Sequence, residues 1–158
     1  MTPQNFFDEL IHNRVLVCAF CAWTIAQIVK CIIYMITHHE LRLERLFGDG
    51  GMPSGHSATV TAAAVSALWC FGIGSFEFAI TFIFAIITMH DAMGVRLETG
   101  KQAVILNEMM EIFTQDEDNK VVFHQDKLKE FVGHTPIQVV AGSILGCIIA
   151  IVFCSLVH

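Results

Sequence analysis

Four apolar stretches constrain the fold of this chain more than any other feature of its sequence. A helix needs roughly 20 mostly apolar residues to cross the hydrocarbon core of a bilayer, and the stretches approach that length at about residues 15–36, 57–74, 76–93 and 137–157. Charged residues make up only 15% of the 158 residues, against roughly 25% in an average soluble domain. We therefore expect an all-α fold, a single domain over residues 1–158: a multi-pass membrane helical bundle of about four transmembrane spans.

The segments between these stretches predict how the bundle is connected and oriented. Gly72 and Gly74 punctuate a tight turn, which makes the second and third spans an antiparallel hairpin. Residues 101–113 place apolar and charged side chains on opposite sides, as an interfacial amphipathic helix does. Most Lys and Arg residues follow the first or third span, and the opposite side has only Arg14. The positive-inside rule then places both of these loops in the cytoplasm.

The charge and the small residues of the chain limit the class of partner. A net charge of −6 without a basic cluster argues against nucleic acid. Gly142 and Gly146 form a small-residue face that permits close helix contact. This face can pack against another helix of the same chain or against a second copy in a homo-oligomer. The sequence leads us to expect no cofactor and no metal site.

A glycine-rich segment, Gly-Gly-Met-Pro-Ser-Gly-His over residues 50–56, runs directly into the second span. The N-terminus of a helix offers unbonded N–H groups and a partial positive charge, and it therefore suits an anion. Ser54 can cap this helix, Gly55 lets the backbone approach a ligand, and His56 is placed to give a proton to whatever binds. An ordinary capped helix with a surface histidine would account for Ser-Gly-His taken alone.

A second histidine, His134, precedes the fourth span. Pro136 suits the first turn of a helix, and Gln138 follows His134 by four residues, so its amide can hydrogen-bond the imidazole and fix which ring nitrogen is free. In the first span, an unpaired Lys30 would cost roughly 3 kcal/mol in hydrocarbon. Lys30 should therefore face a partner or an aqueous pocket in the bundle, unless it snorkels to the interface. This topology gathers Lys30, Arg45, His56, Arg96 and His134 toward one cytoplasmic mouth.

Taken together, these motifs resemble a known superfamily. Pro-Ser-Gly-His at residues 53–56, and a histidine followed by a polar residue and Val-x-x-Gly, resemble the second and third motifs of the type 2 phosphatidic acid phosphatase and vanadium-dependent haloperoxidase superfamily. The divergent branch, a family of short integral membrane proteins, resembles the chain almost throughout. The matching elements lie at residues 26–30, 50–54, 91–96, 100–103, 106–108 and 133–136.

The resemblance implies roles for particular residues. In the superfamily, one histidine attacks phosphorus, the histidine after Pro-Ser-Gly protonates the leaving oxygen, and a lysine and two arginines hold the phosphate. Carried over to this chain, that implies His134 as nucleophile, His56 as general acid and Lys30 as phosphate ligand.

The chain also departs from the superfamily pattern. Gln138 stands where the superfamily has an acid, and an amide can fix a tautomer but cannot stabilise an imidazolium by charge. Thr37 stands where an arginine is expected after Lys30, which leaves Arg45 as a positional candidate. The Ser-Arg pair expected ahead of the nucleophile is missing, and Arg96 is a candidate substitute on topological grounds.

Three functions remain open from the sequence. The first is hydrolysis of a lipid phosphate without a metal, through a phosphohistidine, with Ser54, Gly55 and Arg96 binding the phosphate. The second is a metal-assisted phosphatase that uses Asp91 and Glu108, with Arg96 and Lys101 on the phosphate. The third is a phospholipid-binding scaffold or subunit without catalysis, because the missing acid and arginines are consistent with lost activity.

Overall fold

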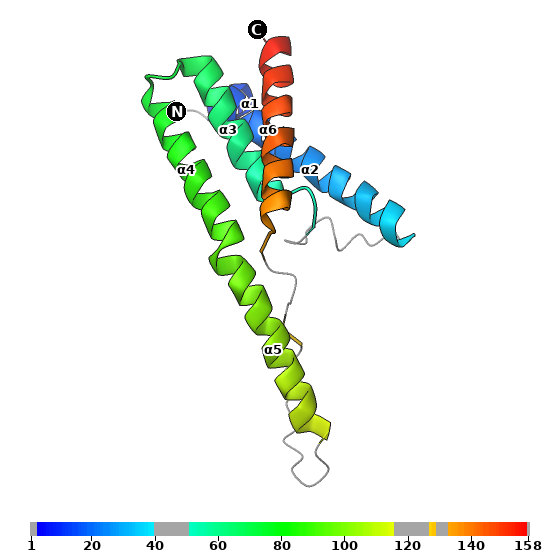
Figure 1. The fold of residues 1–158 in the computed structure, drawn as a ribbon. Coiled ribbons are helices and arrows are strands. Elements are labelled where there is room, and N and C mark those ends of the chain that lie inside the picture. Colours follow the sequence, from blue (N-terminus) through cyan, green and yellow to red (C-terminus); the bar gives the residue numbers. More distant parts are fainter. Residues whose placement is uncertain (1–2, 40–50, 116–126, 129–132, 158) are drawn as a thin grey trace.

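The computed structural model describes residues 3–39, 51–115, 127–128 and 133–157. Every regular element within these residues is a helix (Figure 1). The helices are α1 (Pro3–His12), α2 (Arg14–His38), α3 (Gly55–Phe71), α4 (Phe76–Met93), α5 (Val95–Gln115) and α6 (Pro136–Leu156). All four predicted spans are therefore helical, and the prediction of an all-α membrane bundle is confirmed.

Three stretches of helix are long and apolar enough to cross a membrane: α2, α4 continued into α5, and α6. The remaining predicted span, α3, has 17 residues. That length corresponds to about 25 Å, which is shorter than the hydrocarbon core of about 30 Å. Of the four predicted spans, α3 is thus the one that falls short of a full crossing.

The short helix α3 is nevertheless the centre of the bundle, since α2, α4 and α6 all pack on it. Small residues make this possible. A Cβ atom added to Gly142 would overlap the carbonyl oxygen of Ser54, and one added to Gly146 would overlap that of Ala58. The two backbones therefore touch, and the predicted close contact along this glycine face is confirmed.

The helix starts and the hairpin follow from local sequence. Asn13, Ser54 and Ser75 each cap a helix, because each side-chain oxygen accepts a hydrogen bond from a backbone N–H three residues later. Gly72 ends α3 with a φ of 85°, a conformation that favours glycine. The predicted hairpin between α3 and α4 is present.

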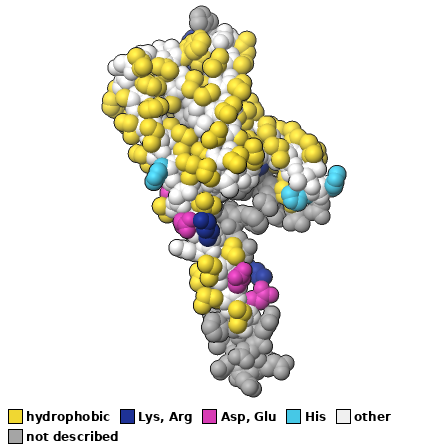
Figure 2. Space-filling view, in the orientation of Figure 1, with side chains coloured by type: hydrophobic (Ala, Val, Ile, Leu, Met, Phe, Trp, Pro, Cys, Tyr) yellow, Lys and Arg dark blue, Asp and Glu magenta, His cyan; other side chains and the backbone are white. Residues whose placement is uncertain are grey.

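The predicted amphipathic helix is also present, but it begins earlier and runs in a different direction from an interfacial helix. Gly94 does not break the chain of hydrogen bonds, because its N–H donates to His90 O at 2.9 Å and its carbonyl accepts from Glu98 N at 3.1 Å. In Figure 1, α5 continues α4 away from the bundle. Figure 2 shows hydrophobic side chains over most of the bundle on this face, and acidic and basic side chains gathered where α5 leaves it.

Candidate functional site

The start of α3 is a tightly capped helix N-terminus. Ser54 Oγ accepts hydrogen bonds from Ser57 N at 3.3 Å and from Ser57 Oγ at 3.0 Å, and both side chains are fully buried. The first hydrogen bond within the helix runs from Ala58 N to Ser54 O at 3.1 Å. The N–H groups of Gly55 and His56 precede that bond, so they belong to the free end of the helix dipole. Ser54 thus shapes this N-terminal end of α3 through its cap.

The start of α6 is tied to the end of α4. His134 N donates to Ala92 O at 3.0 Å. Gly133 precedes it with a φ of 94°, and a Cβ atom there would overlap the backbone of Arg96 and Leu97. Glycine is therefore required for the chain to lie against the first turn of α5 and to bring His134 into the bundle.

The two helix starts meet, and they bring the two histidines together. Ser54 N donates to Gln138 O at 3.1 Å, which links the cap of α3 to the first turn of α6. The ring centroids of His56 and His134 lie 5.9 Å apart, with the ring planes at 61°. His134 is 2% exposed, and His56 is partly buried. The facing arrangement predicted from topology is present in the structure.

The hydrogen bonds of Gln138 decide which nitrogen of His134 carries the proton. Thr135 N donates to Gln138 Oε1 at 3.1 Å, and a backbone N–H can only donate, so this amide atom is the oxygen. The same oxygen lies 3.3 Å from His134 Nδ1. Because an amide oxygen only accepts, Nδ1 must carry the hydrogen, and in the neutral ring Nε2 keeps its lone pair.

Lys30 lies in the buried stripe of α2. Cys18, Ala22, Ala26 and Lys30 follow one another at four-residue spacing, and all are buried, with Lys30 4% exposed. The stem of Lys30 runs beside the glycine loop, since a Cβ atom at Gly51 would lie 3.4 Å from Lys30 Cγ and Cδ. This burial favours a bundle-facing lysine over snorkelling.

Gln27, three residues before Lys30, is a site residue to which the sequence motifs assign no role. A Cβ atom at Gly55 would lie 3.3 Å from Gln27 Nε2, so the amide sits against the start of α3. Gln27 is 9% exposed, and its Oε1 has no hydrogen-bond partner among the described residues. A buried polar atom of this kind costs about 1–3 kcal/mol until a partner arrives. The spacing of three residues from Lys30 was the available signal.

The cations of α5 are paired with neighbouring carboxylates. Arg96 Nε donates to Asp91 Oδ2 at 3.0 Å, and the two side chains are 43% and 45% exposed. Lys101 Nζ donates to Glu98 Oε1 at 2.7 Å on a more exposed part of the helix. Arg96 lies beside Gly133 and hence near His134, whereas Lys101 lies farther along α5. Arg45 falls outside the described residues.

Helix geometry argues against the metal site considered from the sequence. Glu108 follows Asp91 by seventeen residues, and α5 continues the direction of α4. That spacing separates them by about 25 Å, too far for one ion. Asn107 binds Leu128 instead: its Nδ2 donates to Leu128 O, and its Oδ1 accepts from Leu128 N, both at 2.9 Å. Within the described residues, no three His, Cys, Asp or Glu side chains are grouped as metal ligands.

Comparisons with known proteins place this site in context. The sequence profile described as the divergent PAP2 family matches residues 11–149, which include both histidines. YuiD of Bacillus subtilis (strain 168), described as an uncharacterized membrane protein, is 37% identical over 151 residues, or 91% of this chain and 96% of YuiD. No solved structure matches the chain significantly.

Proposed function

The chain belongs to the divergent PAP2 family and is an integral membrane protein, and from this premise we propose that it hydrolyses the phosphate monoester of a lipid phosphate through a phosphohistidine intermediate. The observation that carries this proposal is the pair of His56 and His134, whose ring centroids lie 5.9 Å apart. Both rings are within reach of one phosphoryl group, because attack and proton transfer each need a heavy-atom distance of about 3 Å.

In the first step, His134 Nε2 attacks phosphorus. Its lone pair forms the P–N bond while the bond from phosphorus to the lipid oxygen breaks. His56, as an imidazolium, gives its proton to that leaving oxygen, and the lipid departs as an alcohol. Gln138 Oε1 holds the Nδ1 hydrogen, which aims Nε2 at the substrate.

In the second step, water attacks the phosphorus of the phosphohistidine. His56, now neutral, accepts a proton from that water, the P–N bond breaks, and its electron pair returns to His134 Nε2. Inorganic phosphate leaves with the oxygen taken from water. The burial of His134 limits the access of water to the intermediate before the lipid alcohol has departed.

Binding of the phosphate is assigned to the groups that meet at the start of α3. The N–H groups of Gly55 and His56 offer hydrogen bonds to phosphoryl oxygens, and the Lys30 ammonium supplies positive charge. Arg96 joins them by exchanging Asp91 for phosphate. Arg45 remains a candidate from its position in the sequence.

The composition of the protein supports two further parts of the proposal: the kind of substrate and the side of the membrane on which the site lies. Apolar side chains cover most of the bundle on the face that Figure 2 shows, which suits a substrate whose phosphate is carried on a lipid. The excess of Lys and Arg after the first and third spans supports a site at the cytoplasmic surface.

The test is phosphate release by the purified protein from a panel of lipid phosphates, with and without chelator. We expect release that survives chelator, and we expect His134→Ala and His56→Asn to lower it by about 10²-fold or more. Circular dichroism and thermal melting would show that each variant is folded.

Two results would overturn this assignment. Release that chelator abolishes would favour metal-assisted chemistry. Binding of lipid phosphate without any release by the wild type would favour a non-catalytic phospholipid-binding protein.

A further inference from the structure

A valley runs along the bundle between α2 and α4. Both helices pack on α3. Every residue of α2 and α4 is described by the structure, and the two helices do not contact each other. Three hollows of about 590, 330 and 360 Å³ lie along this side of α3: α1, α2 and α3 line the first, α3 and α4 line the second, and α2, α3 and α4 line the third. Thr59 lines the first two, Ala63 lines the second and third, and Leu16 lines the first and third, so the hollows adjoin one another.

The floor of this valley is a row of small residues on α3, and its walls are apolar. Thr59, Ala63 and Ala67 make the floor, while Leu16 and Phe20 on α2 stand on one side. On the other side stand side chains of α4 that are half or more exposed: Ile80, Ile83, Phe84 and Ile87. The hydroxyl of Thr59 donates to Gly55 O at 2.8 Å, so this floor residue needs no hydrogen bond from an occupant.

The floor leads directly to the proposed catalytic pair. His56, Thr59, Ala63 and Ala67 follow one another on α3 at intervals of three or four residues, which is one face of a helix. The helix rises about 16 Å over the eleven steps from His56 to Ala67. Half of a bilayer core is about 15 Å, so the valley is as long as the part of one leaflet that acyl chains fill.

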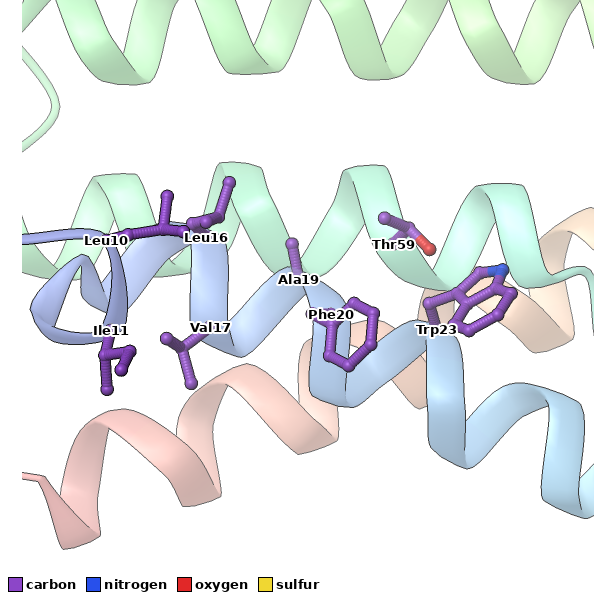
Figure 3. Close-up of a pocket in the computed structure, with 8 residues that line it drawn as sticks. All are labelled: Leu10, Ile11, Leu16, Val17, Ala19, Phe20, Trp23 and Thr59. Carbon is purple, nitrogen blue, oxygen red and sulfur yellow. The ribbon is translucent and has the colours of Figure 1, made fainter. Parts of the chain in front are cut away.

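The end of the valley nearest the site adjoins Gln27, whose buried Oε1 has no hydrogen-bond partner among the residues that the structure describes. Figure 3 shows Trp23 beside Thr59 at this end of the first hollow. A Cβ atom at Gly55 would lie 3.8 Å from Trp23 Cδ1 and 3.3 Å from Gln27 Nε2, so the ring and the amide flank the same backbone position. The Gln27 amide, whose Oε1 has no hydrogen-bond partner within the described ranges, therefore lies beside Trp23, where the first hollow meets the start of α3.

From this arrangement we infer that the valley holds an acyl chain of the lipid phosphate, with its phosphate at His56 and His134. The inference rests on the proposed function, which it extends to the part of the substrate that does not react. An occupant with an apolar tail and a hydrogen-bonding junction below its head fits both the walls and Gln27. A helix from a second copy would cover the walls but would not explain a continuous floor that ends at the histidine pair.

Blocking the floor tests this inference. We expect Ala63→Phe to lower kcat/KM for dipalmitoyl phosphatidate by about tenfold or more, because even one methylene in an apolar pocket changes kcat/KM by about that factor. Dibutyryl phosphatidate, whose tails end near the site, should be hydrolysed as before. Ala79→Phe is the matched control, since Ala79 is exposed on α4 and lines none of the hollows.

Equal loss on both substrates in a folded Ala63→Phe protein would overturn the inference. So would an unchanged preference for chain length, or a valley found covered by a second copy whose dimer Ala63→Phe disrupts without changing that preference.

Photolabelling separates this inference from the proposed function, because it needs no turnover. Phosphatidate with a diazirine on its acyl chain should label peptides of α2, α3 and α4 that line the valley in the full-length protein. Unlabelled phosphatidate should compete and diacylglycerol should not. If this pattern is found in a protein that releases no phosphate, the acyl-chain site in the valley is supported and the proposed hydrolysis is overturned. If labelling is spread evenly over the outer faces of all helices, the acyl-chain site is overturned even where phosphate is released.

Discussion

Two regions of the molecule hold polar side chains in opposite ways. Where α3 and α6 begin, Ser54 N donates to Gln138 O and His134 N donates to Ala92 O, so backbone hydrogen bonds between helices fix the positions of the buried Ser54 and His134 side chains. Along α5, Arg96 pairs with Asp91 and Lys101 pairs with Glu98, and the side chain of Arg96 is partly exposed while that of Lys101 is largely exposed. We call the first region the crossing (residues 51–58 and 133–142, together with Lys30, whose stem lies beside Gly51) and the second the arm (residues 95–115).

The difference matters because burial decides what a polar contact is worth. Exposed ion pairs contribute about 0–1 kcal/mol, since water and salt compete with them. A buried polar group that loses its partner costs about 1–3 kcal/mol. Positions in the crossing are therefore fixed by the fold, whereas cations of the arm can change partners, and for this reason the proposed chemistry is assigned to the crossing.

The sharpest contrast is between two lysines. Lys30→Met should weaken binding of vanadate, a phosphate analogue, by about tenfold or more, because a hydrogen bond to a charged group is worth about 1.5–3 kcal/mol. Lys101→Met is the matched control, and we expect it to leave binding nearly unchanged, since Lys101 is exposed and paired with Glu98. Isothermal titration of each folded variant measures the effect. Equal losses would erase the distinction between crossing and arm.

Backbone contact in the bundle can be tested with alanine. Gly146→Ala places a Cβ atom against Ala58 O, and overpacking of this kind costs about 1–3 kcal/mol. It should lower the melting temperature even though alanine is the better helix former. Gly74→Ala, where nothing lies within 4 Å of the added atom, is the control. A Gly146→Ala protein as stable as the wild type would mean that the two helices are not in backbone contact.

Gln138 allows the chemistry of the crossing to be improved. Gln138→Glu can accept from both Thr135 N and His134 Nδ1, as the amide oxygen does, and its charge stabilises the positive ring that forms as Nε2 attacks. Phosphohistidine formation in single turnover should become several-fold faster at a saturating concentration of lipid phosphate. Gln138→Met removes the acceptor and should slow it. An unchanged or lower rate in folded Gln138→Glu would count against His134 as nucleophile.

The smallest expected effect concerns the arm. Asp91→Asn removes the charge that pairs with Arg96, so vanadate binding should tighten by about twofold if Arg96 turns to phosphate. Stability should change by less than about 1 kcal/mol. Weaker binding would assign Arg96 a purely structural role.

Periodicity and composition predict most of this fold. The apolar stretches locate the helices of the bundle, and Gly142 with Gly146 predicts the contact of α6 with α3. The direction of α5 was not predictable, because glycine is common at helix ends. Only the hydrogen bonds on either side of Gly94 show that the helix continues. The shortness of α3 was equally hidden, since Gly72 and Ile73 extend its apolar run beyond Phe71, the last residue of the helix.

The candidate site likewise has features that the sequence predicts and features that only the structure shows. Two histidines after helix-start signals could be paired from topology, and their separation depends on three long-range contacts: Ser54 to Gln138, His134 to Ala92, and Gly133 to α5. Such contacts leave no periodic trace in one sequence. The unsatisfied amide of Gln27 was invisible for the same reason, because burial without a partner is a property of the packed structure.

The central claim is that phosphate passes through His134. Its most direct test is a single turnover with a lipid phosphate carrying labelled phosphorus, quenched in alkali, in which phosphohistidine is stable, and followed by peptide mapping. The account predicts label on His134 in the wild type, faster labelling in Gln138→Glu, and none in folded His134→Ala. Release of phosphate by the wild type with no label on His134 at any quench time, or equal release by His134→Ala, would contradict it.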